Sequence, residues 1–464
     1  MKLKKNSKMK IVTGIATLLI AMSCTSNDAF DQIPDQAKND VVNSETNIFR
    51  VSEEEAKERL AFVMNQLEPV PTYGSSRRVA KDVHAWRLDK QGAGTYSSTG
   101  GSFMGIDTLL YIINFNDDNG FALVSADNRT TPVLAIINDG FMTADDIENV
   151  DNPGFIAFMN NAIGMLLNEI ATNDEPIATY ATAAVDQSNM IQVRSNTTRS
   201  YPARLKTKWG QMHPYNMLTP MLSNTRTPTG CVATAGAQAL SFFQTINSVS
   251  WTDSRHNASG SSALNWNAII SDSEQWDWAV KNERWRHVPE YYRDNTYGYG
   301  RLGTGRTTTT QVAHLMRYLG CKINATYSPS STEASTDQLL VFLKFSCGLS
   351  GSFSMMEKYT PRNVFDAFDS SNALVLIRAN NKNESVGHSW LIDGGQEIIY
   401  SGNDKKQYVH CNFGWDSYSD GYYLSGVFAC TNGPVFADNR IELGGGTADG
   451  VIYTENIAYA ILKK

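Results

Sequence analysis

Residues 231–243 are the feature that most constrains how this chain folds. They carry no charged side chain, and the apolar residues Ala235, Ala239 and Phe243 recur among them at helical spacing. A helix of such small and apolar residues is buried, so the run predicts a helix in a domain core. Cys231 stands at its first turn, where the helix dipole favours the thiolate, which is the nucleophilic form of cysteine. Because such a cysteine alone is more often just a small buried side chain, a catalytic role needs further groups.

His388 is the strongest candidate for a general base among the seven histidines. It follows Gly387 at the start of a predicted strand, 388–393, and a rigid strand beside a small residue holds an imidazole open to a cleft. His314 lies inside a helical pattern, which favours a packed or surface residue. His410 lies in another strand without a cluster of further metal ligands.

Asn412 is the candidate that would orient this base. It lies in the predicted strand 407–413, and an antiparallel pairing of residue 392 with 408 also places 388 opposite 412. The Asn412 amide oxygen would then accept the imidazole N–H and fix the tautomer. The alternative is a strand-end amide that only satisfies backbone groups.

Gln211 is the candidate for stabilising an oxyanion. It lies upstream of Cys231 in a loop rich in turn residues. A side-chain amide near the thiol, together with the Cys231 backbone N–H, would form an oxyanion hole. By itself the residue is an unremarkable glutamine.

The N-terminus is an export signal. Five lysines precede an apolar stretch, 11–21, that is too short to span a bilayer as a mature helix. Ala21-Met22-Ser23-Cys24 then resembles a bacterial lipobox, which would place a lipid on Cys24. The alternative is an ordinary secretory signal with an incidental cysteine. We therefore expect a cell-surface or outer-membrane lipoprotein, with a periplasmic or secreted protein as the alternatives.

The rest of the chain divides by composition. Residues 172–200 are rich in Ala, Thr, Ser and Asn, which suits an exposed linker where proteolysis concentrates. The expected parts are a signal peptide, 1–24; a tether, 25–50; a small α+β unit, 51–171; a linker with a maturation site, 172–200; and a larger α+β domain, 201–464.

Periodicity and turn residues predict the main elements. Ser52 and Glu55 form a capping box for a helix that ends near Leu67. Further predicted elements are strands at 109–115, 121–125 and 133–137, a helix at 155–170, and strands at 373–378, 421–424 and 456–462.

Composition excludes several function classes. The net charge of −7 gives no support for nucleic-acid binding, and 42% hydrophobic residues are enough for real cores. Six cysteines without a CxxC pair make a zinc site unlikely and are too few for a disulfide scaffold. Cys321, Cys347, Cys411 and Cys430 either pair or lie buried as free thiols. We expect no metal and no organic cofactor.

Four motifs in order resemble the streptopain-like cysteine proteases, which are bacterial papain-fold enzymes exported as zymogens. The resemblance covers the chain from about residue 201 to its end. The motifs are Trp209-Gly210-Gln211, Thr229-Gly230-Cys231-Val232, Gly387-His388-Ser389-Trp390 and His410-Cys411-Asn412-Phe413-Gly414-Trp415. The segments 111–115 and 120–127 resemble the inhibitory prodomain of that family.

The resemblance implies an α+β fold, with a papain-like cysteine protease domain preceded by a smaller α+β prodomain. It implies that Cys231 is the nucleophile, His388 the base and acid, and Gln211 the oxyanion donor. It also implies that Asn412, Phe413 and Trp415 close the site behind the histidine, with Gly387 and Trp390 as support.

This chain departs from the family pattern near the site. It has Phe413 and Asp416 where the family shows Trp and Gly, so the residue that orients His388 is left open. Tyr327-Ser328 stands where the family has Tyr-Gly, and Glu333 follows in a loop that borders the family's substrate groove.

The expected activity is hydrolysis of protein or peptide substrates through a thioacyl intermediate on a Cys-His dyad. The prodomain would block the groove until the linker is cut, and a separate inhibitor protein is a further expected partner. We expect contact with a membrane only through the lipid on Cys24. The alternatives are a catalytically inactive papain-fold surface protein that only binds, and a thiol acyltransferase.

Overall fold

The computed structural model describes most of the chain after its N-terminal segment. The described ranges are 47–68, 78–87, 106–147, 150–177, 198–281, 306–351, 355–370, 372–380, 387–401, 404–429 and 457–464. The predicted signal peptide with Cys24, nearly all of the tether, much of the linker and Cys430 lie outside them. We call the described residues up to 177 the N-terminal lobe and those from 198 the C-terminal lobe.

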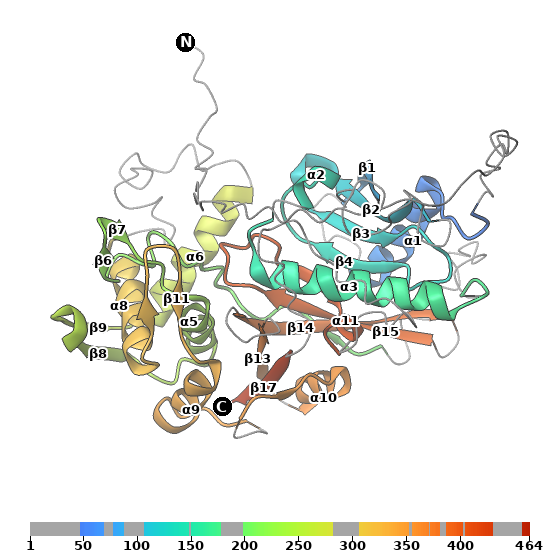
Figure 1. Ribbon diagram of the computed structural model, residues 1–464. Coiled ribbons are helices and arrows are strands. Elements are labelled where there is room, and N and C mark those ends of the chain that lie inside the picture. The colour runs from blue at the N-terminus through green and yellow to red at the C-terminus, as the bar shows by residue number, and fades with distance from the viewer. Residues whose placement is uncertain are drawn as a thin grey trace, which may run out of the picture. The chain divides into compact units, whose positions relative to one another are not determined.

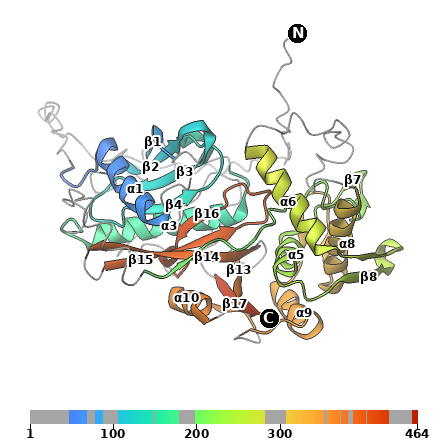
Figure 2. The same cartoon turned by 180° about the vertical axis from the view of Figure 1, so that it is seen from behind.

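The N-terminal lobe is an antiparallel sheet with a helix on each face. Every residue of β2, β3 and β4 is buried, because α1 covers one face and α3 the other (Figures 1 and 2). The elements are α1 (Glu53–Leu67), β1 (Ala80–Arg87), β2 (Thr108–Phe115), β3 (Phe121–Ser125), β4 (Val133–Ile137), α2 (Ala144–Ile147) and α3 (Pro153–Thr172). The predicted helices and strands of this lobe are confirmed, including the Ser52 capping box, while β1 was not predicted.

Helix α3 starts with strong local signals. Asn152 caps it by accepting hydrogen bonds from the N–H groups of Gly154 at 3.0 Å and Phe155 at 3.3 Å. Pro153 occupies the first helical position, where its missing N–H costs nothing. The Asn152 side chain also donates to the carbonyl of Tyr418 in the C-terminal lobe at 3.0 Å. The cap therefore fixes the start of α3 against the other lobe.

The C-terminal lobe has a helical half and a sheet half, which gives the α+β architecture expected for a papain-like domain. The helical half packs α5 against α8 and α9 around one hydrophobic core. Its elements are α5 (Cys231–Phe243), β8 (Ser248–Asp253), β9 (Ala258–Ala263), α6 (Trp266–Lys281), α8 (Arg306–Lys322), β10 (Thr326–Tyr327), β11 (Thr332–Glu333) and α9 (Thr336–Ser346). The predicted helix over residues 231–243 is confirmed.

The sheet half supplies the remaining long strands. The predicted strands are confirmed within a few residues at their ends, except that the strand predicted over 388–393 continues to Ser401. Its elements are α10 (Pro361–Ser370), β13 (Ala373–Asn380), β14 (Gly387–Ser401), β15 (Asp404–Asn412), β16 (Gly421–Leu424), α11 (Ser425–Ala429) and β17 (Ala458–Lys463). The short strands are β5 (Ser200–Tyr201), β6 (Met221–Leu222), β7 (Thr225–Arg226) and β12 (Glu357–Lys358).

One sheet runs through both lobes. Strand β4 pairs with β16, with Ile136 opposite Tyr422, and the order is β1-β2-β3-β4-β16-β15-β14-β13-β17-β12. The hydrophobic core of the N-terminal lobe is likewise continuous with that on one side of the C-terminal sheet. The sequence predicted two α+β units but not that their strands join.

The predicted register of β14 and β15 is wrong. Asn412 lies opposite Leu391 rather than His388, and Tyr408 lies opposite Gln396. Both strands extend to a hairpin closed near Ser401, with an irregularity after Ile392. Since hairpin closure and bulges set the register of an antiparallel pair, the shift follows from the extra length of these strands.

Three properties of the described residues bear on membrane crossing, metal binding and cysteine state. None of their helices combines the length and the apolar character needed to cross a bilayer. They hold no group of three potential metal ligands. Within the same ranges Cys321, Cys347 and Cys411 are free thiols.

Candidate active site

Cys231 is the first residue of α5. Gly230 precedes it with a φ of 86°, a left-handed conformation that favours glycine. Burial raises the pKa of the Cys231 thiol, while hydrogen bonding by the backbone of Ser389 and Val232 acts in the opposite direction. Burial outweighs these hydrogen bonds, which favours the protonated thiol in this state.

His388 is buried at the start of β14, with 2% of its surface exposed. Its Nε2 lies 2.9 Å from the carbonyl oxygen of Phe413, so Nε2 carries the proton and donates it to this hydrogen bond. The ring stacks on Trp390 with centroids 5.9 Å apart and meets Trp415 edge-on at 5.8 Å. Burial lowers the pKa of His388 to about 4, so the ring is neutral at pH 7.

Cys231 and His388 line the same cleft, of about 580 Å³. Among the described residues, the partner of the His388 ring is Phe413, and no hydrogen bond or ion pair joins His388 to Cys231. The two groups that the sequence predicts as a dyad thus share a cleft as a neutral thiol and a neutral imidazole. In this arrangement they form no thiolate–imidazolium pair.

The N-terminal lobe lies directly against the histidine. A Cβ on Gly154, in the first turn of α3, would lie 2.2 Å from Cδ1 of Phe413 and 3.0 Å from Cδ2 of His388. Only a glycine allows the helix to approach these two rings so closely. The described residues that line the cleft all belong to the C-terminal lobe. The N-terminal lobe therefore contacts the histidine side of the site, whereas the sequence predicted that it blocks the groove.

Asn412 does not orient His388. Its Oδ1 accepts hydrogen bonds from Gln238 Nε2 at 2.8 Å and from the Gly414 N–H at 3.1 Å. Its Nδ2 donates to the carbonyl of Thr207 at 3.0 Å. These bonds tie helix α5 and residue Thr207 to the end of β15, so Asn412 supports the site away from the imidazole.

The Phe413 backbone takes the position that the sequence assigned to Asn412. Its carbonyl accepts from His388, and its N–H donates to Asp420 Oδ1 at 2.9 Å. The Phe413 ring packs on Trp390 with centroids 5.4 Å apart. Trp390 and Trp415 thus pack against the imidazole, and the Phe413 ring packs on Trp390 behind it.

Gln211 lies in the loop that precedes the nucleophile. Its backbone carbonyl accepts from the N–H of Thr229 at 2.9 Å, two residues before Cys231. The side chain is half-buried. The loop is thereby held next to the start of α5, but no described contact joins the Gln211 amide to Cys231, so its oxyanion role remains a prediction.

Gln238 is a site residue that the sequence reasoning missed. It is fully buried on α5 and connects Asn412 with the Trp209 backbone, whose N–H donates to Gln238 Oε1 at 3.2 Å. A single glutamine inside an otherwise small and apolar helix was the available signal, since a buried amide needs partners.

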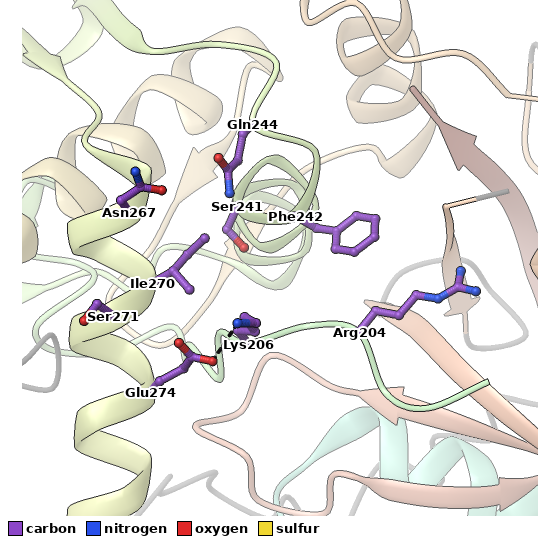
Figure 3. A pocket seen from close by; sticks show the side chains of 9 residues that line it. All are labelled: Arg204, Lys206, Ser241, Phe242, Gln244, Asn267, Ile270, Ser271 and Glu274. Carbon is purple, nitrogen blue, oxygen red and sulfur yellow. Dashed lines mark ion pairs between the residues drawn. The ribbon is translucent and has the colours of Figure 1, made fainter.

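A second pocket lies away from the thiol. It has a volume of about 420 Å³, and Lys206 and Glu274 form an ion pair of 2.9 Å at its edge (Figure 3). None of the predicted site residues lines it. The cleft with Cys231 and His388 is therefore the candidate active site.

Each lobe matches a known protein family. Residues 209–423 match the Peptidase C10 family, and residues 50–162 match the Spi protease inhibitor family. Streptopain from Streptococcus pyogenes is 25% identical over 397 residues, which cover 81% of this chain and 85% of streptopain. The chain is a streptopain-like cysteine protease zymogen.

Two solved structures are similar to parts of the zymogen. Prointerpain A from Prevotella intermedia is 19% identical with a TM-score of 0.46, covering 76% of this chain and 94% of that one. Active interpain A from the same organism is 20% identical with a TM-score of 0.36, and the match covers 57% of this chain and 94% of interpain A. The enzyme assignment sets aside the alternative of an inactive binding protein.

The contribution of His388 to the stability of the zymogen is expected to be lost as the pH falls from 6.5 towards 4. Burial lowers the His388 pKa from 6.5 to about 4, so the stabilisation from its neutral ring is complete above pH 6.5 and lost through this window, by about 3 kcal/mol. Asp420, whose pKa burial raises to about 7, has the opposite sign, and its larger shift offsets the His388 loss in the total stability. The His388 contribution is therefore measured as the difference in unfolding free energy between Cys231→Ala and Cys231→Ala/His388→Gln, because Asp420 is common to both. This difference should change by about 3 kcal/mol in favour of the double variant as the pH falls through the window, and a constant difference would contradict the assignment.

Gly154→Val is expected to weaken latency without changing the C-terminal lobe. The valine side chain collides with Phe413 and His388, so α3 has to move away from the histidine. We expect Cys231 in the full-length variant to react with a thiol-specific probe at least about tenfold faster than in wild type, which is about 1.4 kcal/mol of lost contact. Gly164→Ala, further along α3, is the control helix substitution. Wild-type reactivity in Gly154→Val would show that α3 does not hold the latent state.

Proposed function

We propose that the protein is an exported cysteine endopeptidase that hydrolyses peptide bonds through Cys231 and His388. The observation that carries the proposal is their common cleft, with Cys231 at the start of a buried helix and His388 on a rigid strand. Both lie within the segment that matches a peptidase family.

The chemistry follows from the two groups. His388 takes the thiol proton, and the Cys231 sulfur attacks the substrate carbonyl carbon. The Cys231 N–H and the Gln211 amide hold the oxyanion, an interaction typically worth about 3–4 kcal/mol per donor. His388 then gives its proton to the leaving amine as the C–N bond breaks and a thioester forms. Water, deprotonated by His388, hydrolyses the thioester and restores the thiol.

Latency in this proposal comes from the histidine side of the site. With α3 in place, the imidazole is neutral and bonded to the Phe413 carbonyl, and the thiol is protonated. Departure of the N-terminal lobe would expose His388 and let the pair ionise. We further propose that a separate inhibitor protein would bind the surface that α3 leaves.

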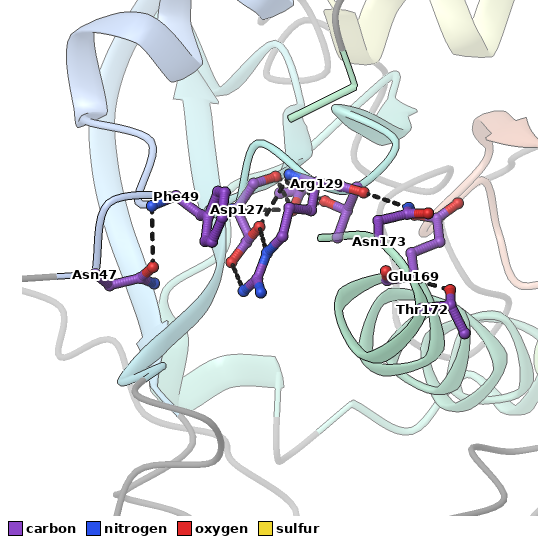
Figure 4. Close-up of polar contacts among 9 residues, drawn as sticks. Asn47, Phe49, Asp127, Arg129, Glu169, Thr172 and Asn173 are labelled. Atoms are coloured by element: carbon purple, nitrogen blue, oxygen red, sulfur yellow. Dashed lines mark hydrogen bonds and ion pairs between the residues drawn. The ribbon is translucent and has the colours of Figure 1, made fainter. Parts of the chain in front are cut away.

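The N-terminal lobe holds the start of the linker. The Ile177 N–H donates to the carbonyl of Asn128 at 3.0 Å. Asn173 donates to the carbonyl of Arg129 at 2.8 Å, and the Arg129 guanidinium lies 4.2 Å above the Phe49 ring (Figure 4). The chain thus stays attached to this lobe as far as residue 177.

The C-terminal lobe holds the other end. Arg199 forms 2.9 Å ion pairs with Asp366 and Asp369, and its carbonyl accepts from the Glu397 N–H at 2.9 Å. Tyr201, in β5, pairs with Gly395 in β14. A maturation cut between residues 177 and 199 would therefore leave both ends bonded to their own lobes.

Self-maturation is the test of this function. Wild-type protein purified alone should acquire a new N-terminus between residues 178 and 199. Because the cut needs the Cys231 thiolate, Cys231→Ala and His388→Ala should remain uncut, and added mature enzyme should process both. Mass spectrometry of the new N-terminus measures the site. If Cys231→Ala matures at the wild-type rate when purified alone, the proposed nucleophile is wrong.

We also propose that the protein is exported and carries a lipid on Cys24, from the signal and lipobox in its sequence. The expected mature N-terminus is an acylated Cys24 in the membrane fraction. Cys24→Ser should move the protein to the soluble exported fraction. An unmodified N-terminus beyond residue 24 in the wild type would favour an ordinary secretory signal.

A further inference from the structure

The segment from Thr332 to Thr336 spans the cleft between the two site residues. At one end, Thr332 Oγ1 donates to the Pro228 carbonyl at 2.7 Å, and a Cβ on Gly230 would lie 3.0 Å from Thr332. At the other end, the hydroxyls of Thr336 and Ser389 lie 2.5 Å apart. The segment is therefore fixed beside the residue before Cys231 and beside the residue after His388.

Glu333 is held within this segment. It pairs with Thr326 across the short β10–β11 hairpin. The hairpin turn is closed by the Ser328 N–H donating to the Ser331 carbonyl at 2.8 Å, and Ser335 caps α9. The Glu333 backbone thus has a defined place on the cleft wall, while its side chain is exposed.

The cleft carries a negative charge that no described residue neutralises. Glu333 is the one carboxylate among the described residues that line it. Arg378, the cation on the same wall, pairs with Asp337 at 2.5 Å rather than with Glu333. The described residues include no ion pair or hydrogen bond of the Glu333 side chain, so it is available to a bound peptide.

We propose that Glu333 selects substrates with a lysine or arginine close to the scissile bond. A carboxylate carried by a fixed backbone segment at the cleft wall attracts a basic side chain and accepts hydrogen bonds from it, and it disfavours an acidic one. This inference rests on the proposed function of the Cys231 cleft and names its substrate class. The chain itself carries a single basic residue, Arg194, between residues 178 and 198, where maturation is proposed.

Peptide pairs test the preference in mature enzyme. Each pair differs only by Lys or Gln at one position, scanned over four positions on each side of the cleaved bond. We expect kcat/KM to favour Lys about fivefold at one or more positions, the upper range for a solvent-exposed ion pair. The ratio should fall as salt rises from about 0.05 to 0.5 M, because the Debye length shortens. A ratio near one at every position would overturn the proposal.

Variants assign the preference to this residue. Glu333→Gln should bring the Lys-to-Gln ratio to about one, and Glu333→Lys should make the enzyme prefer Glu over Gln at the same position. Glu274→Gln, an exposed carboxylate at the other pocket (Figure 3), should keep the wild-type ratio. An unchanged ratio in Glu333→Gln would overturn the inference alone. Cleavage by Cys231→Ala at the wild-type rate would overturn the proposed function and the inference together.

Discussion

The alternation of side chains along β14 is the constraint on which the rest of the site depends. Trp390 and Ile392 lie in the core shared with the N-terminal lobe, whereas Leu391 lies in the helical core that contains α5. Because side chains alternate along a strand, His388 has the parity of Trp390 and its ring lies on the side that α3 covers. One strand therefore serves both cores, and any movement of the N-terminal lobe changes the surroundings of the imidazole.

The segment after β15 couples this histidine to the continuous sheet. Phe413 holds His388 through its carbonyl and is itself held by Asp420, and the carbonyl of Asp420 accepts from the N–H of Asn138, next to β4. The contact to His388 comes from the backbone, so it does not depend on the side chain at position 413. This explains why a phenylalanine is compatible with a position where the family shows tryptophan.

Local sequence signals predicted the elements, and long-range pairing decided the site. The small residues of 231–243 and the Ser52 capping box act within a few residues, so both helix starts were predictable. The partner of Asn412 depends instead on the length of the β14–β15 hairpin and on Gln238, 174 positions away in the sequence. The pairing of β4 with β16 likewise cannot be predicted from periodicity, because an edge strand and an internal strand can have the same pattern of apolar residues.

In the proposed mechanism, latency is electrostatic more than steric. The described residues that line the cleft belong to the C-terminal lobe, whereas helix α3 lies against the histidine. Burial lowers the pKa of His388 to about 4 and raises the pKa of the Cys231 thiol, so moving the thiol proton to the imidazole is unfavourable in this arrangement. When α3 departs, solvent exposure of the ring would raise the pKa of His388, and the imidazolium so formed would lower the pKa of Cys231. In the proposed mechanism, the contact of helix α3 with His388 therefore keeps the imidazole neutral and unable to take the thiol proton.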